Sequence, residues 1–135
     1  MQINGKQYLS VWFENERVKM IDQNKLPHEF RIAEYSNYLE ICSAIREMTV
    51  RGAPAIGAAA AYAIALAAQN APEEKFRVYL RTARDEIIAT RPTAIDLRNG
   101  VNYVYEQTIK FIPDYKHSRQ VAILAAREFA KKSID

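Results

Sequence analysis

The run from Ala53 to Ala68, APAIGAAAAYAIALAA, constrains the fold most, because it carries no charged side chain and is built mainly from alanine. A membrane-spanning helix needs about 20 consecutive apolar residues, and this run is shorter and contains few strongly apolar side chains. A surface helix would instead show polar residues on one face. The run therefore predicts a helix that lies deep among neighbouring elements, with small side chains that allow close approach.

Helical patterns also precede and follow this run. After Ser36 the apolar residues repeat at helical spacing, and Asn37 with Glu40 forms the pattern of a capping box. A third helix is predicted to begin near Pro72, a residue suited to a first turn, and to stop before Pro92. The alanine-rich helix is thus expected to have helical neighbours on both sides in the sequence.

Two more helices are predicted toward the end of the chain. Thr93 is a candidate N-cap for the fourth helix, which Pro113 ends, and Ser118 is a candidate N-cap for the fifth. Each helix other than the alanine-rich one has a predicted apolar face. The faces are Tyr38, Ile41, Ile45 and Met48 in the first helix; Phe76, Tyr79, Leu80, Ala83 and Ile87 in the third; Leu97, Val101, Val104, Tyr105 and Thr108 in the fourth; and Val121, Leu124, Ala125 and Phe129 in the fifth.

The first 35 residues have the pattern of β-strands. The segments KQYLSVWF and RVKMID flank the turn residues ENE, in which Asn15 suits a left-handed conformation. The segment EFRIAE alternates, with Phe30 and Ile32 on one side, and Pro27 precedes it in a loop. We therefore predict a mainly α, α+β fold in one domain: a small antiparallel β-sheet over residues 1–35, then a bundle of about five helices over residues 36–135.

Composition limits the functional classes. The 135 residues are 49% hydrophobic, enough for a buried core, and the net charge of +3 comes from Lys and Arg interspersed with Asp and Glu. No block of like charge marks a nucleic-acid surface and no apolar leader follows Met1, so we expect neither a nucleic-acid nor a membrane partner. The single cysteine, Cys42, excludes an internal disulfide and favours a cytoplasmic location.

Groups that suit an anion stand directly before the alanine-rich helix, in TVRGAPAIG. Pro54 fits a first helical turn, and Gly52 lets the backbone approach a ligand closely or take positive φ. The amino end of a helix offers free N–H groups and partial positive charge, and Arg51 adds guanidinium donors for phosphate or carboxylate. The residues alone leave open that Arg51 is an ordinary surface residue and that the alanines merely pack.

A second arginine, Arg91, lies in the segment TRPTAIDL. It precedes Pro92 and is therefore expected in extended backbone before a helix, where Thr93 and Asp96 are capping candidates. Two arginines at two helix amino ends suit one phosphorylated ligand, although the spacing alone is more typical of an ordinary corner between helices.

Other candidate groups give weaker patterns. His28 and His117 are far apart in the sequence and lack the spacing of metal ligands, so no metal site is predicted. Cys42 lies beside an apolar helix face and is interpreted as a small core residue rather than a nucleophile. The sequence contains no glycine-rich nucleotide loop and no serine elbow.

Three segments, DQNKLPHEF, AIREMTVRGAPAIGAAAAYAIALA and TRPTAIDL, occur in the order and form of a known family. Over nearly its whole length the chain resembles the amino-terminal part of the methylthioribose-1-phosphate isomerase family. That family also contains ribose-1,5-bisphosphate isomerase and the regulatory subunits of the two-B translation initiation factor. The resemblance implies a domain of a small sheet and helices, followed in family members by a Rossmann-like domain, with the active site between the two.

The resemblance also implies a sugar-phosphate site. The RGAP motif matches Arg51, Gly52 and Ala53, the RPT motif matches Arg91, and these four residues form the expected binding set for a phosphorylated pentose. The isomerases convert an aldose 1-phosphate to a ketose 1-phosphate, a step of methionine salvage, without a metal or organic cofactor. They use a cysteine and an aspartate of the Rossmann-like domain, so no catalytic residue is assigned in this chain.

The chain departs from the family pattern in two ways. It ends before the Rossmann-like domain, so we expect it to be inactive alone, and Cys42 and Asp96 do not match the catalytic pair. Asp96 also stands where the family has asparagine, which lowers the local positive potential. Three interpretations stay open: a piece of a longer isomerase, one subunit of a split enzyme completed by a separate Rossmann-like domain or subunit, or a non-catalytic regulatory module. We expect an exposed apolar face and self-association or a partner.

Overall fold

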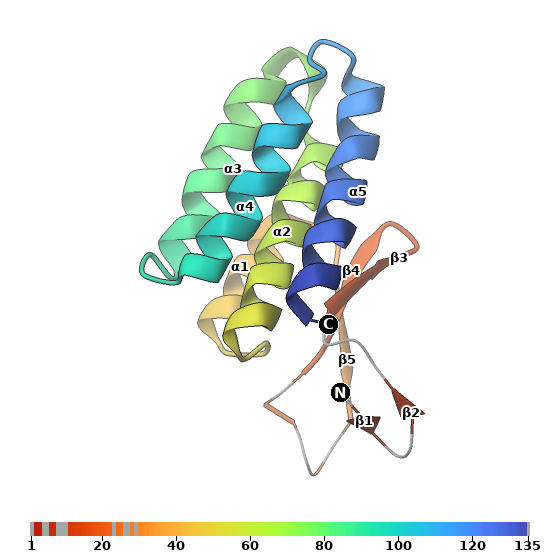
Figure 1. The fold of residues 1–135 in the computed structure, drawn as a ribbon, viewed down its shortest axis with the longest axis vertical. Helices are drawn as coiled ribbons and strands as arrows, with labels where there is room; N and C mark the ends of the chain where they lie inside the picture. Colours follow the sequence, from red (N-terminus) through yellow and green to blue (C-terminus); the bar gives the residue numbers. More distant parts are fainter. Residues whose placement is uncertain are drawn as a thin grey trace.

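The computed structural model describes residues 2–3, 6–7, 11–22, 24–25, 28 and 30–134. Five helices follow a small antiparallel sheet, which confirms the predicted α+β, mainly α fold (Figure 1). The strands are β1 (Gln2–Ile3), β2 (Lys6–Gln7), β3 (Val11–Glu14), β4 (Arg17–Ile21) and β5 (Ile32–Tyr35). The helices are α1 (Tyr38–Arg46), α2 (Ala53–Asn70), α3 (Phe76–Thr90), α4 (Ile95–Ile109) and α5 (Tyr115–Ile134), with a 3₁₀ turn at Glu73–Lys75 before α3.

The main sheet has the order β3-β4-β5, and both pairings are antiparallel. Asn15 and Glu16 join β3 to β4 with φ of 54° and 61°, so the predicted left-handed turn is confirmed and extends over two residues. Opposite residues share a face of the sheet, and Val18 and Met20 on the inner face are buried. β1 and β2 pair separately, and Pro27 lies outside the described residues.

The alternation of β5 places Ile32 on the outer face of the sheet, where its side chain is 40% exposed. Ala33 pairs with Met20 and Tyr35 pairs with Val18, so these two residues of β5 face the core. The sequence pattern therefore found the strand, but Ile32, the apolar residue that it singled out, lies on the solvent side.

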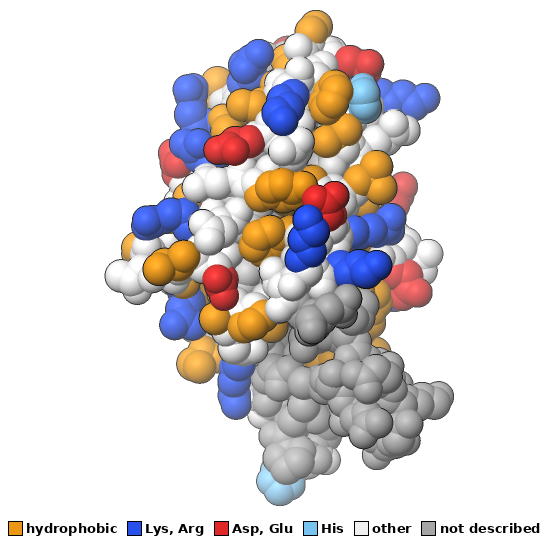
Figure 2. All heavy atoms as spheres, viewed as in Figure 1, with side chains coloured by type: hydrophobic (Ala, Val, Ile, Leu, Met, Phe, Trp, Pro, Cys, Tyr) orange, Lys and Arg blue, Asp and Glu red, His pale blue; other side chains and the backbone are white. Residues whose placement is uncertain are grey.

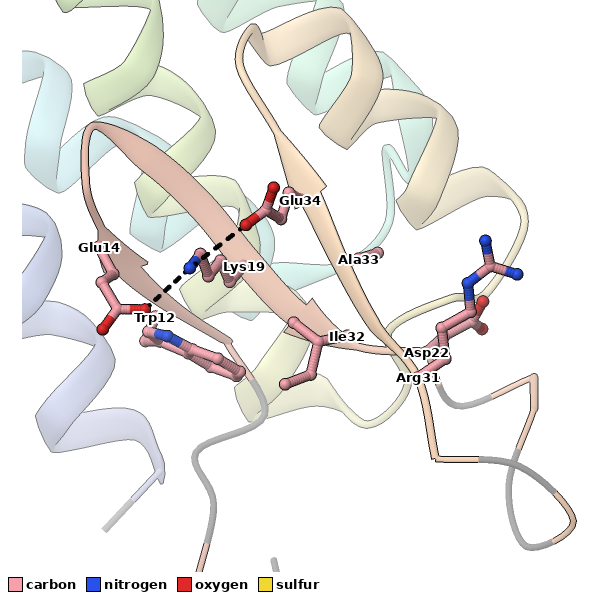
Figure 3. A pocket seen from close by; sticks show the side chains of 8 residues that line it. All are labelled: Trp12, Glu14, Lys19, Asp22, Arg31, Ile32, Ala33 and Glu34. Atoms are coloured by element: carbon pink, nitrogen blue, oxygen red, sulfur yellow. Dashed lines mark hydrogen bonds and ion pairs between the residues drawn. The ribbon is translucent and has the colours of Figure 1, made fainter.

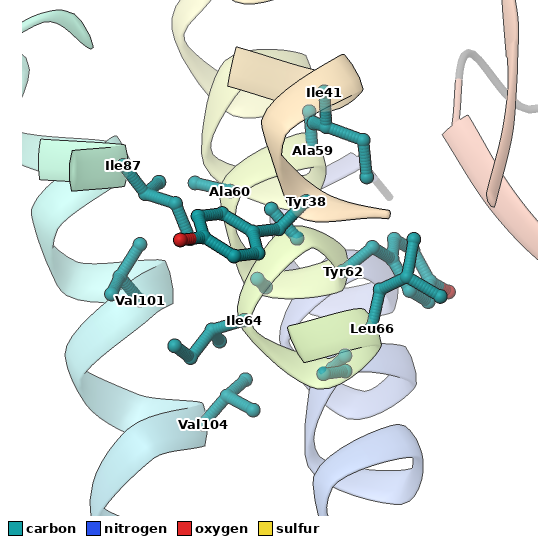
Figure 4. Packing of buried hydrophobic residues seen from close by; sticks show 14 of the residues in the cluster. Tyr38, Ile41, Ala59, Ala60, Tyr62, Ile64, Leu66, Ile87, Val101 and Val104 are labelled. Atoms are coloured by element: carbon teal, nitrogen blue, oxygen red, sulfur yellow. The ribbon is translucent and has the colours of Figure 1, made fainter. Parts of the chain in front are cut away.

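Helix α2 forms the centre of the bundle, as its composition predicts. All its residues from Ala55 to Ala68 are buried, and it packs against the other four helices and against β3 and β4. Figure 4 shows Ile64 pointing toward α4, while Tyr62 and Leu66 point to the opposite side. Most of the surface that α2 offers is methyl groups and backbone, so its neighbours lie close to its axis.

Two glycines set the closest approach, where α4 crosses α2. A Cβ added to Gly100 would lie 2.5 Å from the carbonyl oxygen of Gly57, and one added to Gly57 would lie 2.9 Å from the carbonyl oxygen of Asp96. Glycine is therefore required at both positions for this crossing. Since Gly57 lies in α2 beneath the first turn of α4, the crossing also brings the amino ends of the two helices together.

The predicted capping box of α1 is confirmed. The Asn37 side chain accepts from the backbone N–H of Glu40 at 3.1 Å, and the Glu40 carboxylate accepts from the Asn37 N–H. The helix ends at Arg46, so Met48 does not extend its apolar face as predicted. Met48 instead has φ of 62° in the connection to α2, and its side chain is 49% exposed.

The other two capping predictions are wrong. Helix α4 begins at Ile95 after Ala94, and no side chain caps it, so neither Thr93 nor Asp96 acts as the cap. Helix α5 begins three residues before Ser118, and the Asp114 carboxylate accepts from the N–H of His117. Ser118 is buried inside the helix, and its hydroxyl has no hydrogen-bond partner in the described part of the chain.

The apolar faces of α3 and α4 follow the predicted pattern, whereas that of α5 is confirmed at Ala125 and Phe129 and is wrong at Leu124. Leu124 is 62% exposed, and the apolar side chains that α5 buries are those of Ala122, Ala125, Ala126 and Ala130. Packing against the crowded alanine-rich helix favours small residues over larger apolar ones at this interface. Among the described residues, the helices lack the combination of length and apolar character that crossing a bilayer requires.

Candidate anion-binding site

A pocket of about 300 Å³ lies where the amino ends of α2 and α4 meet. It is lined by Gly52, Ala53, Ile56, Arg91, Ala94, Ile95, Asp96 and Leu97. Three of the four residues predicted to bind substrate, Gly52, Ala53 and Arg91, therefore share one pocket although about 40 residues of sequence separate them. The fourth, Arg51, is not among the lining residues.

The α2 side of the pocket offers unpaired backbone donors. Gly52 precedes the helix with φ of 89°, and its carbonyl oxygen accepts the first helical hydrogen bond from the N–H of Ile56 at 2.9 Å. No side chain caps this end, and Pro54 has no N–H, so the N–H groups of Ala53 and Ala55 have no acceptor within the helix. The first turn also contains no acidic residue. This end of α2 is therefore open to an anion.

The α4 side of the pocket is held by a short turn. The N–H of Ala94 donates to the carbonyl oxygen of Arg91 at 3.0 Å, and the Arg98 guanidinium donates to the carbonyl oxygen of Pro92 at 2.6 Å. These bonds fix the backbone that carries Arg91, whose side chain is exposed. Asp96 lies half-buried in the first turn, where its carboxylate offsets part of the positive potential of the helix end.

Arg51 is turned toward the loop that follows β4. Its Nη2 donates to the side-chain oxygen of Asn24 at 2.6 Å, and its Nε donates to the carbonyl oxygen of Met48 at 3.3 Å. Of the two arginines predicted to bind one ligand, Arg91 thus lines the pocket and Arg51 does not. Asn24 was not singled out from the sequence, because a contact across a loop leaves no periodic signal.

Cys42 and the two histidines lie outside this pocket. Burial raises the pKa of the Cys42 thiol to about 11, so the thiol is protonated near neutral pH, as expected for a core residue. His117 Nδ1 lies 4.0 Å from an Asp114 carboxylate oxygen at the start of α5. Within the described ranges, no group of three His, Cys, Asp or Glu side chains is close enough to hold a metal ion.

A larger hollow of about 650 Å³ lies over the outer face of the main sheet (Figure 3). Its central cation, Lys19, is already paired with Glu14 at 2.9 Å and Glu34 at 3.2 Å. Hydrogen bonding to Lys19 lowers the pKa of Glu14, and the same contact raises the pKa of Lys19. Because this cation is neutralised by two carboxylates, the hollow suits an anion less well than the pocket between the helix ends.

Two surface features bear on partners. Figure 2 shows one face of the molecule, on which Lys and Arg lie among Asp, Glu and apolar side chains. Ile95, which lines the pocket, is 72% exposed. Sequence reasoning missed Ile95 as a pocket residue because its position at a helix start, and not its residue type, places it there.

Three comparisons place the chain among known proteins. The sequence model of the Initiation factor 2 subunit family matches residues 49–135. A methylthioribose-1-phosphate isomerase from Sinorhizobium medicae is 36% identical over all of this chain and 36% of its own length. The solved 5-methylthioribose 1-phosphate isomerase from Pyrococcus horikoshii superposes with a TM-score of 0.87 at 34% identity, covering 94% of this chain and 37% of that one.

The solved translation initiation factor eIF-2B subunit delta from A. fulgidus has the same TM-score of 0.87, at 32% identity, and covers 93% of this chain and 37% of that one. The chain thus spans about a third of the length of the relatives that it matches. The matched part begins at Thr49 and contains both walls of the pocket.

Proposed function

The chain belongs to the Initiation factor 2 subunit family, and we propose that it is the sugar-phosphate-binding part of an isomerase that converts methylthioribose 1-phosphate to the corresponding ketose 1-phosphate in methionine salvage. The observation that carries this proposal is the pocket between two helix amino ends without side-chain caps, with Arg91 at its wall. Similarity to isomerases over the whole chain supports it.

The binding step follows from the geometry of the pocket. The N–H groups at the start of α2 point in the direction of the helix axis and suit phosphate oxygens. The Arg91 guanidinium supplies paired donors that match two oxygens of one phosphate. The carboxylate of Asp96 opposes the anion, and the site is open to water on the Arg91 side. We therefore expect weak binding by the chain alone, with a dissociation constant of about 1 mM.

The chemical step needs groups that the described pocket does not supply. Isomerisation moves hydrogen between the first two carbons of the sugar, which requires a group that accepts and returns a proton or hydride. Cys42 is buried in the core with a raised pKa, and the described pocket is lined by one carboxylate, Asp96, at a helix start. We propose that a Rossmann-like partner provides the catalytic cysteine and aspartate and closes the site against water.

The proposed partner surface is the apolar rim of the pocket. Ile95 lines the pocket with Arg91 and is 72% exposed. Large apolar side chains that face solvent around a pocket are typical of a surface that another domain covers. In the absence of the Rossmann-like half we expect the chain to self-associate through this rim, and Ile95→Glu to shift it toward the monomer in sedimentation experiments.

Binding is tested by titrating the isotopically labelled chain with methylthioribose 1-phosphate and with inorganic phosphate. We expect amide resonances of Gly52, Ala53 and Ile95 to shift, and Arg91→Ala to weaken binding about tenfold. The control is Arg81→Ala, because Arg81 is exposed on α3 and leaves the pocket unchanged. Equal affinity in Arg91→Ala, or no shift at these amides, contradicts the proposed site.

Catalysis is tested with the chain alone and then mixed with a separately expressed Rossmann-like half of a relative. We expect no turnover by the chain alone and turnover on mixing that is lost in Arg91→Ala. Turnover by the chain alone that Cys42→Ala abolishes would show that the catalytic cysteine is misassigned.

A second candidate function is a non-catalytic regulatory module. The observation in its favour is that the solved initiation-factor subunit superposes as well as the solved isomerase does. This alternative predicts no turnover on mixing, even when the sugar-phosphate pocket and the Rossmann-like half are both intact.

A further inference from the structure

We propose that Asn24 is a positioning residue that holds the guanidinium of Arg51 outside the pocket and thereby weakens the binding of a phosphorylated ligand. This inference rests on the proposed function, because it concerns the affinity of the same site. It adds a residue from the loop after β4, which supplies none of the lining residues of the pocket.

The contacts of Asn24 fix the orientation of its amide. Its Nδ2 donates to the carbonyl oxygen of Glu47 at 2.9 Å, and its Oδ1 accepts from Nη2 of Arg51 at 2.6 Å. The backbone N–H of Asn24 donates to the Asp22 carboxylate at 3.0 Å, which forms a local turn. Both ends of the amide are therefore engaged, and its acceptor end faces the guanidinium.

Arg51 lies in the connection between α1 and α2. The carbonyl oxygen of Met48, in the same connection, accepts from Nε of Arg51 at 3.3 Å. Two contacts, from Asn24 and from Met48, thus hold the guanidinium on the side of the loop that follows β4.

The pocket lies at the amino end of α2, directly after Arg51 in the chain. The Cα of Arg51 is about 3.8 Å from that of Gly52, which lines the pocket at the positive end of α2. An anion bound there attracts the guanidinium, but Arg51 reaches it only after leaving Asn24 and Met48. When only a fraction of molecules has the competent arrangement, the apparent dissociation constant rises by the inverse of that fraction.

Two substitutions at position 24 are expected to act in opposite directions. Asn24→Ala removes the acceptor and releases Arg51, so phosphate binding becomes about threefold tighter. Asn24→Asp replaces the amide oxygen with a charged acceptor and holds Arg51 more firmly, so binding becomes about fivefold weaker. A residue that only shaped the loop would change affinity in the same direction in both variants.

The experiment titrates inorganic phosphate into the wild-type chain, the two variants at position 24, and each variant combined with Arg51→Ala. In the Arg51→Ala background Asn24→Ala is expected to leave the dissociation constant unchanged, because its effect passes through the missing guanidinium. Arg81→Ala serves again as the control for loss of a surface charge. The Nε–H resonance of Arg51, without ligand, is expected to shift in Asn24→Ala while that of Arg81 does not.

The outcomes separate this inference from the proposed function. Phosphate binding that depends on Arg91 but is equal in the wild type and both variants at position 24 overturns the role of Asn24 and leaves the site intact. A change in the same direction in both variants has the same meaning. If the wild type binds no phosphate, the proposed function fails. In that case the Nε–H resonance of Arg51 still tests the contact with Asn24, and an unchanged resonance in Asn24→Ala shows that Asn24 does not hold the guanidinium.

Discussion

Replacing Gly100 with alanine tests the crossing that brings the amino ends of α2 and α4 together. The new Cβ would lie 2.5 Å from the carbonyl oxygen of Gly57 and 3.0 Å from Cε1 of Phe129. Ordinary contact begins near 3.4 Å, so α4 has to move away from α2 by about 0.9 Å. The ring of Phe129 can turn aside, but the carbonyl group of Gly57 belongs to a buried helix and cannot.

Two opposing terms decide the size of the effect. Overpacking a core typically costs about 1–3 kcal/mol, and a backbone obstacle places this substitution at the upper end of that range. Alanine in a helix interior is favoured over glycine by about 1 kcal/mol. We therefore expect Gly100→Ala to lower the free energy of unfolding by about 2 kcal/mol. For a chain of this length the melting temperature falls by about 8 °C.

Urea and thermal unfolding followed by far-ultraviolet circular dichroism measure this loss. The matched control is Asn99→Ala, which gains helix propensity at the preceding, exposed position of α4. The control is expected to be as stable as the wild type or slightly more stable. A Gly100→Ala variant as stable as the Asn99→Ala control would show that the close approach of the two helices does not constrain this position.

Three further predictions concern α1. Asn37→Ala removes the side-chain acceptor of the capping box with Glu40 and is expected to cost about 1 kcal/mol in urea unfolding. The Cys42 thiol, whose pKa burial raises from 9.0 to about 11, should react with a disulfide reagent at neutral pH roughly 100-fold more slowly than in the unfolded chain; equal rates contradict its burial. Burial, aided by the hydrogen bond to Glu86, raises the pKa of Tyr38 from 10.0 to about 12. The neutral phenol thus contributes stability that is complete below pH 10 and is lost as pH rises toward 12, so Tyr38→Phe should flatten the alkaline loss of stability, and an unchanged slope between pH 10 and 12 refutes this.

Local chemistry made part of the fold predictable from sequence. The capping box at Asn37, the turn at Asn15 and the burial of α2 each follow from residues within a few positions of one another. The errors arose where tertiary packing decided between local alternatives. Leu124 is more apolar than the alanines of α5, but the crowded surface of α2 accepts alanine, and the larger side chain faces solvent.

The candidate site divides in the same way. Gly52 and Arg91 could be singled out because each stands near a proline at a predicted helix start, whereas Ala53 entered the set only through the resemblance to the RGAP motif. The position of the Arg51 guanidinium could not, since it depends on a loop contact with Asn24. A sequence shows which side chains carry donors, but the competition between two acceptors for one guanidinium is decided only in three dimensions.

Because α2 is buried, the backbone amides in the two walls of the pocket exchange with solvent hydrogen by different routes. Backbone amides of a helix that packs against all its neighbours exchange with solvent hydrogen only when the whole molecule unfolds. The turn from Arg91 to Ala94 is largely exposed, and its amides exchange through local opening at much lower free energy. A ligand that bridges the two walls slows deuterium uptake on the α4 side by protecting it from local opening. Uptake in the interior of α2 also slows, because the ligand raises the free energy of global unfolding, but that change becomes visible only at long exchange times. The exposed wall therefore reports occupancy first.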